Sequence, residues 1–130
     1  MLNRWFRRSL VAFAALMAAL FVLPSQASAS ADGCKSGGGS HAVACLTISG
    51  GGTYVEWMYA KGYSYEYPSH IQLYGPPGSI GNGSEVPANQ LSVFEWAPWS
   101  NVPGGDYCSR VWVRTSGTYY SVITKCWTVW

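Results

Sequence analysis

The chain has 130 residues, of which 48% are hydrophobic, 15% aromatic and 11% charged, and its formal net charge is +2. Three basic residues, Arg4, Arg7 and Arg8, precede residue 30 and all six acidic residues follow it, so the part after residue 29 has a formal net charge of −1. This balance argues against a nucleic-acid binder and against a membrane-active cationic peptide, because both normally need a basic patch.

Residues 1–29 are predicted to be a cleaved signal peptide. The early arginines form a basic region, residues 10–23 are apolar but too short to span a membrane as a helix, and Ala27-Ser28-Ala29 fits the rule for cleavage between small residues. Cleavage after Ala29 is our first expectation, and cleavage after Ala31 is nearly as favourable. We therefore expect a secreted, extracellular protein of one domain, with its four cysteines in disulfides.

Residues 30–42 are predicted to be a flexible, glycine-rich segment that can extend along a protein partner. Its candidate partner-binding residues are Gly33, Lys35 and Ser36, with Lys35 directly after Cys34. A lysine in a disulfide-closed loop is also how inhibitors present a basic side chain to trypsin-like serine proteases, since the bridge fixes the backbone before docking. A lone exposed lysine in such a position is also common without any function.

Residues 43–130 are predicted to form an all-β domain. Runs of β-branched and aromatic residues are separated by turns with glycine or proline, and no helical periodicity is visible. Six short strands are expected, over residues 43–48, 53–59, 70–74, 91–96, 107–114 and 119–127. This pattern indicates an antiparallel β-sandwich or small barrel, of which we expect the disulfide-bonded sandwich.

The register of the last hairpin can be predicted from its turn. If Gly117 is the midpoint, Cys108 lies opposite Cys126, within the distance that a disulfide spans. The same register pairs Trp112 with Val122, Val111 with Ile123 and Tyr107 with Trp127. A Cys108–Cys126 disulfide leaves Cys34 to pair with Cys45.

The residues that could carry catalysis or bind a metal do not form a recognisable pattern. The cysteines are widely spaced and no C-x-x-C occurs, so neither a metal site nor a cofactor is expected. His41 and His70 are the two histidines, and no nucleophile-elbow pattern accompanies them. Glu56 and Glu95 could act as an acid–base pair, but both alternate with apolar neighbours and are expected to face solvent. We therefore expect no catalytic residue and no enzymatic activity.

Aromatic residues are the strongest compositional signal. After residue 29 the chain has nine tyrosines and six tryptophans, and Tyr63, Tyr65 and Tyr67 share one face if that stretch is extended. Many of these rings are expected to fill the core. Aromatic faces also stack on sugar rings and dominate protein interfaces, so the excess favours a binding surface for protein or for polysaccharide.

The sequence resembles a group of small secreted β-sandwich proteins of filamentous actinobacteria. The resemblance lies in the signal peptide, the four cysteines, the glycine-rich turn before Thr53-Tyr54-Val55 and the stretch Asp106-Tyr107-Cys108-Ser109-Arg110-Val111-Trp112. Within this group it is most similar to the adaptor subunit of umbrella toxin particles. The resemblance implies a non-enzymatic adaptor that joins a lectin-bearing subunit to a large antibacterial toxin protein. It also implies that the segment around Lys35 docks in a cleft of the lectin-bearing subunit.

Overall fold

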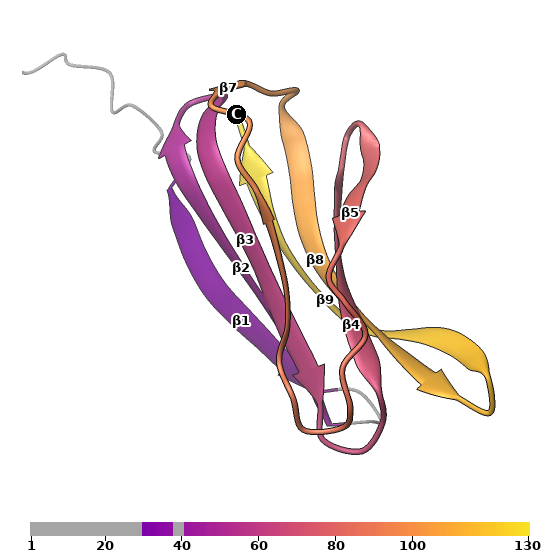
Figure 1. Ribbon diagram of the computed structural model, residues 1–130. Helices are drawn as coiled ribbons and strands as arrows, with labels where there is room; N and C mark the ends of the chain where they lie inside the picture. The colour runs from indigo at the N-terminus through magenta and orange to yellow at the C-terminus, as the bar shows by residue number, and fades with distance from the viewer. Residues whose placement is uncertain (1–29, 38–40) are drawn as a thin grey trace, which may run out of the picture.

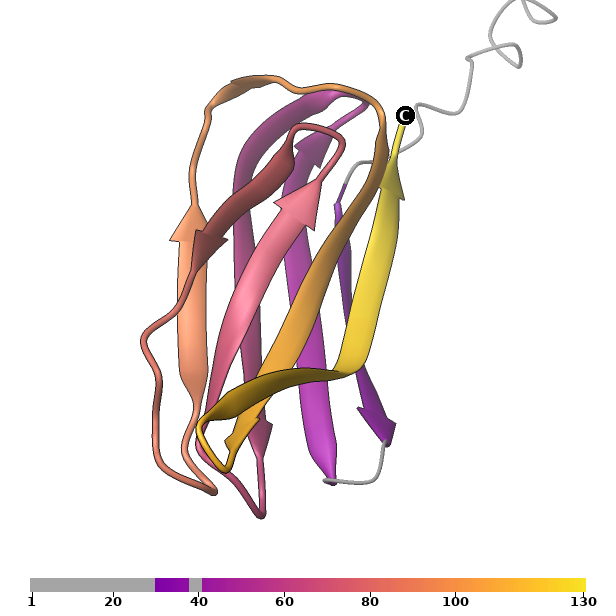
Figure 2. The ribbon, with the colours of Figure 1, turned by 90° about the vertical axis from the view of Figure 1, so that its right-hand side faces the viewer.

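The computed structural model describes residues 30–37 and 41–130, so the predicted signal peptide lies outside the described residues. In this part of the chain nine strands form two antiparallel sheets that pack as a sandwich, as Figures 1 and 2 show. The strands are β1 (Ala31–Gly37), β2 (Ala42–Gly51), β3 (Tyr54–Ser64), β4 (Ser69–Gly75), β5 (Gly78–Asn82), β6 (Ser92–Trp96), β7 (Ser100–Asn101), β8 (Gly105–Thr115) and β9 (Thr118–Val129).

The two sheets have five and four strands. Sheet A has the order β1-β2-β3-β6, with β7 also paired to β3, and sheet B has the order β5-β4-β8-β9. β1 and β9 therefore lie at the edges of their sheets, and they run along the same side of the sandwich in Figure 2. The predicted sandwich is confirmed, with three short strands (β1, β5 and β7) beyond the six expected.

β1 occupies most of the segment that was expected to be flexible. It pairs with β2 along its whole length, and Cys34 lies opposite Cys45 in the predicted disulfide. Glycine and serine have low strand propensity, which is why the sequence indicated flexibility. The cross-strand disulfide and the backbone ladder to β2 fix the segment despite this low propensity.

The register of the β8–β9 hairpin follows the prediction from Tyr107 to Val111 and differs by one residue from Trp112 to the turn. Cys108 and Cys126 face each other and form the second disulfide. The predicted pairing of Trp112 with Val122 is wrong, because Trp112 lies opposite Ser121 and the register shifts after Val111. The turn has two central residues, Ser116 (φ 51°) and Gly117 (φ 78°), so its midpoint falls between them. A β-bulge in β9 takes up the resulting offset of one residue.

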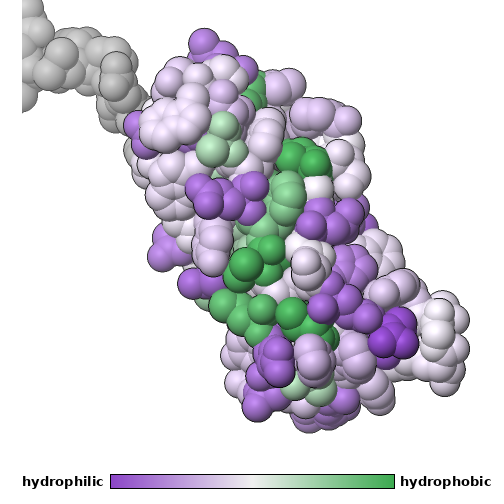
Figure 3. All heavy atoms as spheres, in the orientation of Figure 1, coloured by the Kyte–Doolittle hydropathy of each residue, from purple (hydrophilic) through white to green (hydrophobic). Residues whose placement is uncertain are grey.

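The core lies between the inner faces of the two sheets. Leu46, Met58, Ile71 and Val111 are fully buried there. Tyr107 is buried as well, and its hydroxyl donates a hydrogen bond of 2.8 Å to the carbonyl of Pro103. On the side where β6 lies, apolar side chains reach the surface as a broken strip in Figure 3. Within the described residues there is no helix long and apolar enough to cross a membrane.

Candidate functional site

The open edge of β1 is the first candidate site. The Cα atoms of Cys34 and Cys45 are 4.0 Å apart, a separation typical of opposed residues that exchange no backbone hydrogen bonds. Because backbone groups alternate in direction along a strand, Lys35 directs its N–H and C=O toward Ala44 of β2. Ser36 then directs its own N–H and C=O away from β2, toward the open edge of sheet A.

The strand register aligns this edge with Tyr63, the first of the three tyrosines at 63, 65 and 67. Ser36 lies opposite Val43, and Val43 lies opposite Tyr63, so the three residues form one row across the outer face of sheet A. Adjacent strands are about 4.8 Å apart, so about 10 Å separates Ser36 from Tyr63. Sequence reasoning missed the half-buried Val43, which only the pairing of β1, β2 and β3 identifies. We call Lys35, Ser36, Val43, Tyr63 and Tyr65 the edge site.

Tyr63 and Tyr65 contact each other within the edge site. Their hydroxyl oxygens are 3.0 Å apart, and their rings meet edge to face with centroids 5.0 Å apart. The hydrogen bond to Tyr65 raises the pKa of Tyr63 above its usual value of 10.0, so Tyr63 is uncharged at neutral pH. Tyr67 lies beyond the end of β3 at Ser64, and within the described part of the chain it makes no ring contact with the pair.

Gly33 lies on the inner side of β1, as Lys35 does two residues later, because both are opposite core residues of β2. Gly33 is opposite Leu46, and a Cβ atom at this position would come within 3.0 Å of the Trp127 ring. The Trp127 indole N–H donates a hydrogen bond of 3.1 Å to the carbonyl of Leu46. The missing side chain of Gly33 therefore makes room for Trp127, so β9 can pack across the edge of sheet A.

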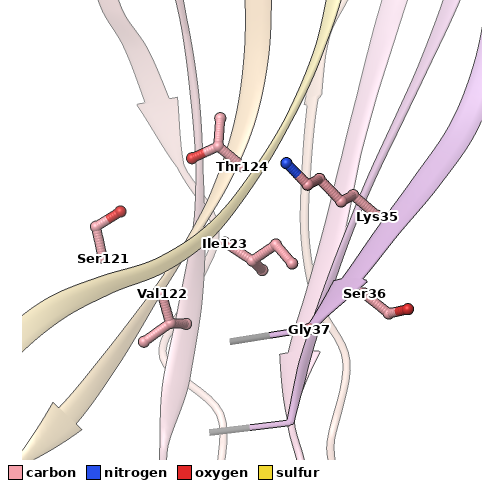
Figure 4. A pocket seen from close by; sticks show the side chains of 7 residues that line it. All are labelled: Lys35, Ser36, Gly37, Ser121, Val122, Ile123 and Thr124. Carbon is pink, nitrogen blue, oxygen red and sulfur yellow. The ribbon is translucent and has the colours of Figure 1, made fainter. Parts of the chain in front are cut away.

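The Lys35 side chain lies over a hollow of about 390 Å³ between β1 and β9. Figure 4 shows it extending from β1 toward Thr124 of β9, with Ile123 between the two strands. Within the described residues the Lys35 side chain forms no hydrogen bond or ion pair. Its ammonium group is therefore available to an acceptor from a partner.

Trp57 marks a second region of the outer face of sheet A. One hollow of about 240 Å³ lies between Trp57, Thr47, Tyr59 and Glu95. Another, of about 360 Å³, is lined by Trp57, Thr47 and Asp32, among others. The indole therefore stands between two hollows that carry both aromatic and carboxylate groups.

The described residues contain no group of three or more histidine, cysteine, aspartate or glutamate side chains that could hold a metal ion. Glu56 accepts a hydrogen bond of 2.8 Å from the Ser49 hydroxyl, whereas Glu95 lies opposite Tyr59. His41 contacts Glu66 at 2.9 Å on the surface, and His70 lies on the outer face of sheet B with its ring against Tyr119.

These features define a small all-β, two-sheet domain with two disulfides. Cross-strand disulfides of this kind are typical of domains that fold in an oxidising compartment. Comparisons with protein-family models, with curated proteins and with solved structures find no match to this chain.

Proposed function

We propose that this protein is a secreted adaptor that catalyses no reaction and links a lectin-bearing subunit to a large antibacterial toxin protein. The identity of the partners rests on the resemblance of the sequence to the adaptor subunit of umbrella toxin particles. The manner of docking rests on one observation, the open edge of β1, where Ser36 directs its backbone groups outward. The Lys35 side chain flanks this edge on the inner side of sheet A, and Tyr63 lies in the row of Ser36 on the outer face.

An open edge strand can accept a partner strand by antiparallel or parallel pairing, in which backbone hydrogen bonds supply affinity and side chains supply specificity. Ser36 offers the backbone groups for such pairing, whereas Lys35 supplies a positive charge at the rim. Tyr63 and Val43 add an apolar surface in the row of Ser36 on the outer face. The backbone groups of Lys35 already pair with Ala44 of β2, so they are not free to bind a protease cleft. The geometry therefore favours strand addition at the open edge over the insertion of Lys35 into a protease.

The direct test is affinity purification of the tagged protein from culture supernatant, followed by mass spectrometry. The tag follows Trp130, because an N-terminal tag would adjoin β1. We expect a lectin-bearing protein and a large secreted toxin to co-purify. Recovery of the protein alone, as a monomer at native expression, would contradict the proposal.

Two charge reversals show whether the edge site is responsible. Lys35→Glu is expected to lose the lectin-bearing partner and keep the toxin. Lys61→Glu makes the same charge change on β3, two strands from β1 and opposite Cys45 of β2, and is expected to keep both partners. If both variants lose the same partner, the charge of the whole sheet and not the edge site governs binding.

Carbohydrate binding is the second candidate function, and the position of Trp57 between two hollows favours it. An indole face can stack on a sugar ring while Asp32 and Glu95 accept hydrogen bonds from hydroxyl groups. Sedimentation with insoluble cell-wall polysaccharide and chitin tests this candidate. Binding that disappears in Trp57→Ala would support it, whereas a protein that stays in the supernatant with every polymer would exclude it.

A further inference from the structure

The centre of the outer face of sheet B holds an arginine between two aromatic rings. Arg110 lies on β8, with its guanidinium carbon 4.2 Å from the centre of the Tyr74 ring and 5.6 Å from that of Trp112. The Trp112 indole N–H donates a hydrogen bond of 2.8 Å to the Gln72 side chain. We call Gln72, Tyr74, Arg110 and Trp112 the Arg110 surface.

The neighbours of Arg110 hold it in one place. Gln72 lies opposite it on β4, and the Gln72 amide also donates a hydrogen bond of 3.0 Å to Ser79 of β5. Arginine held between aromatic rings loses less conformational freedom when it binds a carboxylate than a free side chain would. The surface is therefore organised before any partner arrives.

Arg110 has no anionic partner within the described part of the chain. Its Nε atom is buried without a hydrogen bond, and neither ion pair of the described residues involves it. Glu85 binds Arg114, the other arginine of β8, and Tyr119. Asp106, on the same face of β8, accepts a hydrogen bond of 2.6 Å from Thr128. A half-buried guanidinium that packs on two rings and forms no ion pair is complementary to a carboxylate from outside.

We propose that the Arg110 surface is a docking site for an acidic segment of a second protein, with a carboxylate side chain bound to Arg110. Tyrosine, tryptophan and arginine are the residues that carry most binding energy in protein interfaces, and they lie here at the centre of a sheet. The proposal rests on the adaptor function only for the identity of the partner. It gives the toxin protein a surface on the opposite side of the sandwich from sheet A.

The test uses NMR of the purified, ¹⁵N-labelled protein with defined peptides, so that it does not depend on the natural partners. After residue 29 the sequence contains two arginines, Arg110 and Arg114. The Nε signal that disappears in Arg110→Lys belongs to Arg110, and the one that remains belongs to Arg114. Hexaglutamate is titrated at 150 mM NaCl, with hexaglutamine as the uncharged match. We expect hexaglutamate to shift the Arg110 Nε and Trp112 indole signals saturably, and hexaglutamine to leave them in place.

Variants separate the site from general charge attraction. Arg110→Ala is expected to weaken hexaglutamate binding about tenfold or more, since a charge-assisted hydrogen bond is lost. Arg114→Ala removes the same charge from a side chain already paired with Glu85, and is expected to change the affinity less than about twofold. Circular dichroism confirms that both variants keep the fold.

Four results would overturn the proposal. The first is an equal, unsaturable shift of Arg110 and Arg114, and the second is no shift of either. An equal response to inorganic phosphate would show a general anion site. A shift that follows protein concentration alone would assign the surface to a second copy of this chain. Any of these can occur while Lys35→Glu still loses the lectin-bearing protein, so this proposal and the adaptor function can fail separately.

Discussion

The alternating direction of single residues along β1 determines what the edge of sheet A can bind. Lys35 and Ser36 are neighbours, yet one directs its backbone groups to β2 and the other to the open edge. The sequence could indicate Lys35 and Ser36 as candidates from their place beside Cys34. It could not indicate which of them has a free backbone, because that depends on the register with β2.

Ser36→Pro tests strand addition at this position. Proline removes the N–H that Ser36 directs to the edge, and proline is tolerated on edge strands where the N–H faces outward. We expect the variant to lose the lectin-bearing partner while its free energy of unfolding changes by less than about 1 kcal/mol. Lys35→Pro is the matched control, because it removes an N–H from the β1–β2 ladder and should lower stability. Undiminished partner binding by Ser36→Pro would contradict docking by strand addition.

His70 makes stability depend on pH. Burial lowers its pKa below the usual value of 6.5, although the negative charge of Glu85 opposes this. The unfolded chain therefore takes up a proton before the folded protein does, so stability should fall as pH drops below about 6.5 toward the lower pKa of the folded state. Urea unfolding at several pH values between 7.5 and 5 should show this loss. His70→Gln should reduce it, and an equal loss in both proteins would contradict the assignment.

At the scale of elements, local patterns predicted strands better than they predicted pairing. The hairpin from β8 to β9 was predictable because its two strands are adjacent in sequence and carry cysteines that fix the register. The bulge was not predictable, because a turn centred on one residue and a turn of two residues have nearly the same composition. β5 was missed since Gly78, Ser79 and Gly81 have little strand propensity, and it forms by pairing with β4.

The candidate surfaces depend on pairings between distant elements. The edge site needs β1, β2 and β3 in register, and the Arg110 surface needs β4 beside β8. The resemblance and the spacing of residues pointed to Lys35 and to Tyr63. Nothing local in the sequence places Tyr74 beside Arg110, which lies 36 positions later in the chain.

The Cys34–Cys45 disulfide is expected to matter more for β1 than for the fold as a whole. β1 buries little side-chain surface, so the bridge and the ladder are what hold it. In the double variant Cys34→Ala/Cys45→Ala the free energy of unfolding should fall by about 3 kcal/mol or less on the chain-entropy model. Hydrogen exchange should show faster exchange in β1 and continued protection in β8. If β1 remains as protected as β8, the disulfide is not what fixes the edge.

At the scale of the whole molecule, the sandwich separates two surfaces of different chemistry. Sheet A carries the edge site at its β1 edge and on the outer face beside it, and the outer face of sheet B carries the Arg110 surface. The shared core holds these faces in a fixed relation, and each disulfide joins two strands within one sheet. A rigid domain with one such surface on each sheet can bind two proteins at once without competition between them.

The central claim is that one copy of this protein joins two partners through opposite sheets. Light scattering on the affinity-purified complex tests it most directly, because the mass gives the number of each subunit. We predict a complex with both partners for the wild-type protein, with the toxin alone for Lys35→Glu, and with the lectin-bearing subunit alone for Arg110→Ala. A wild-type mass that accounts for only one partner at a time, or one variant that loses both, would contradict it.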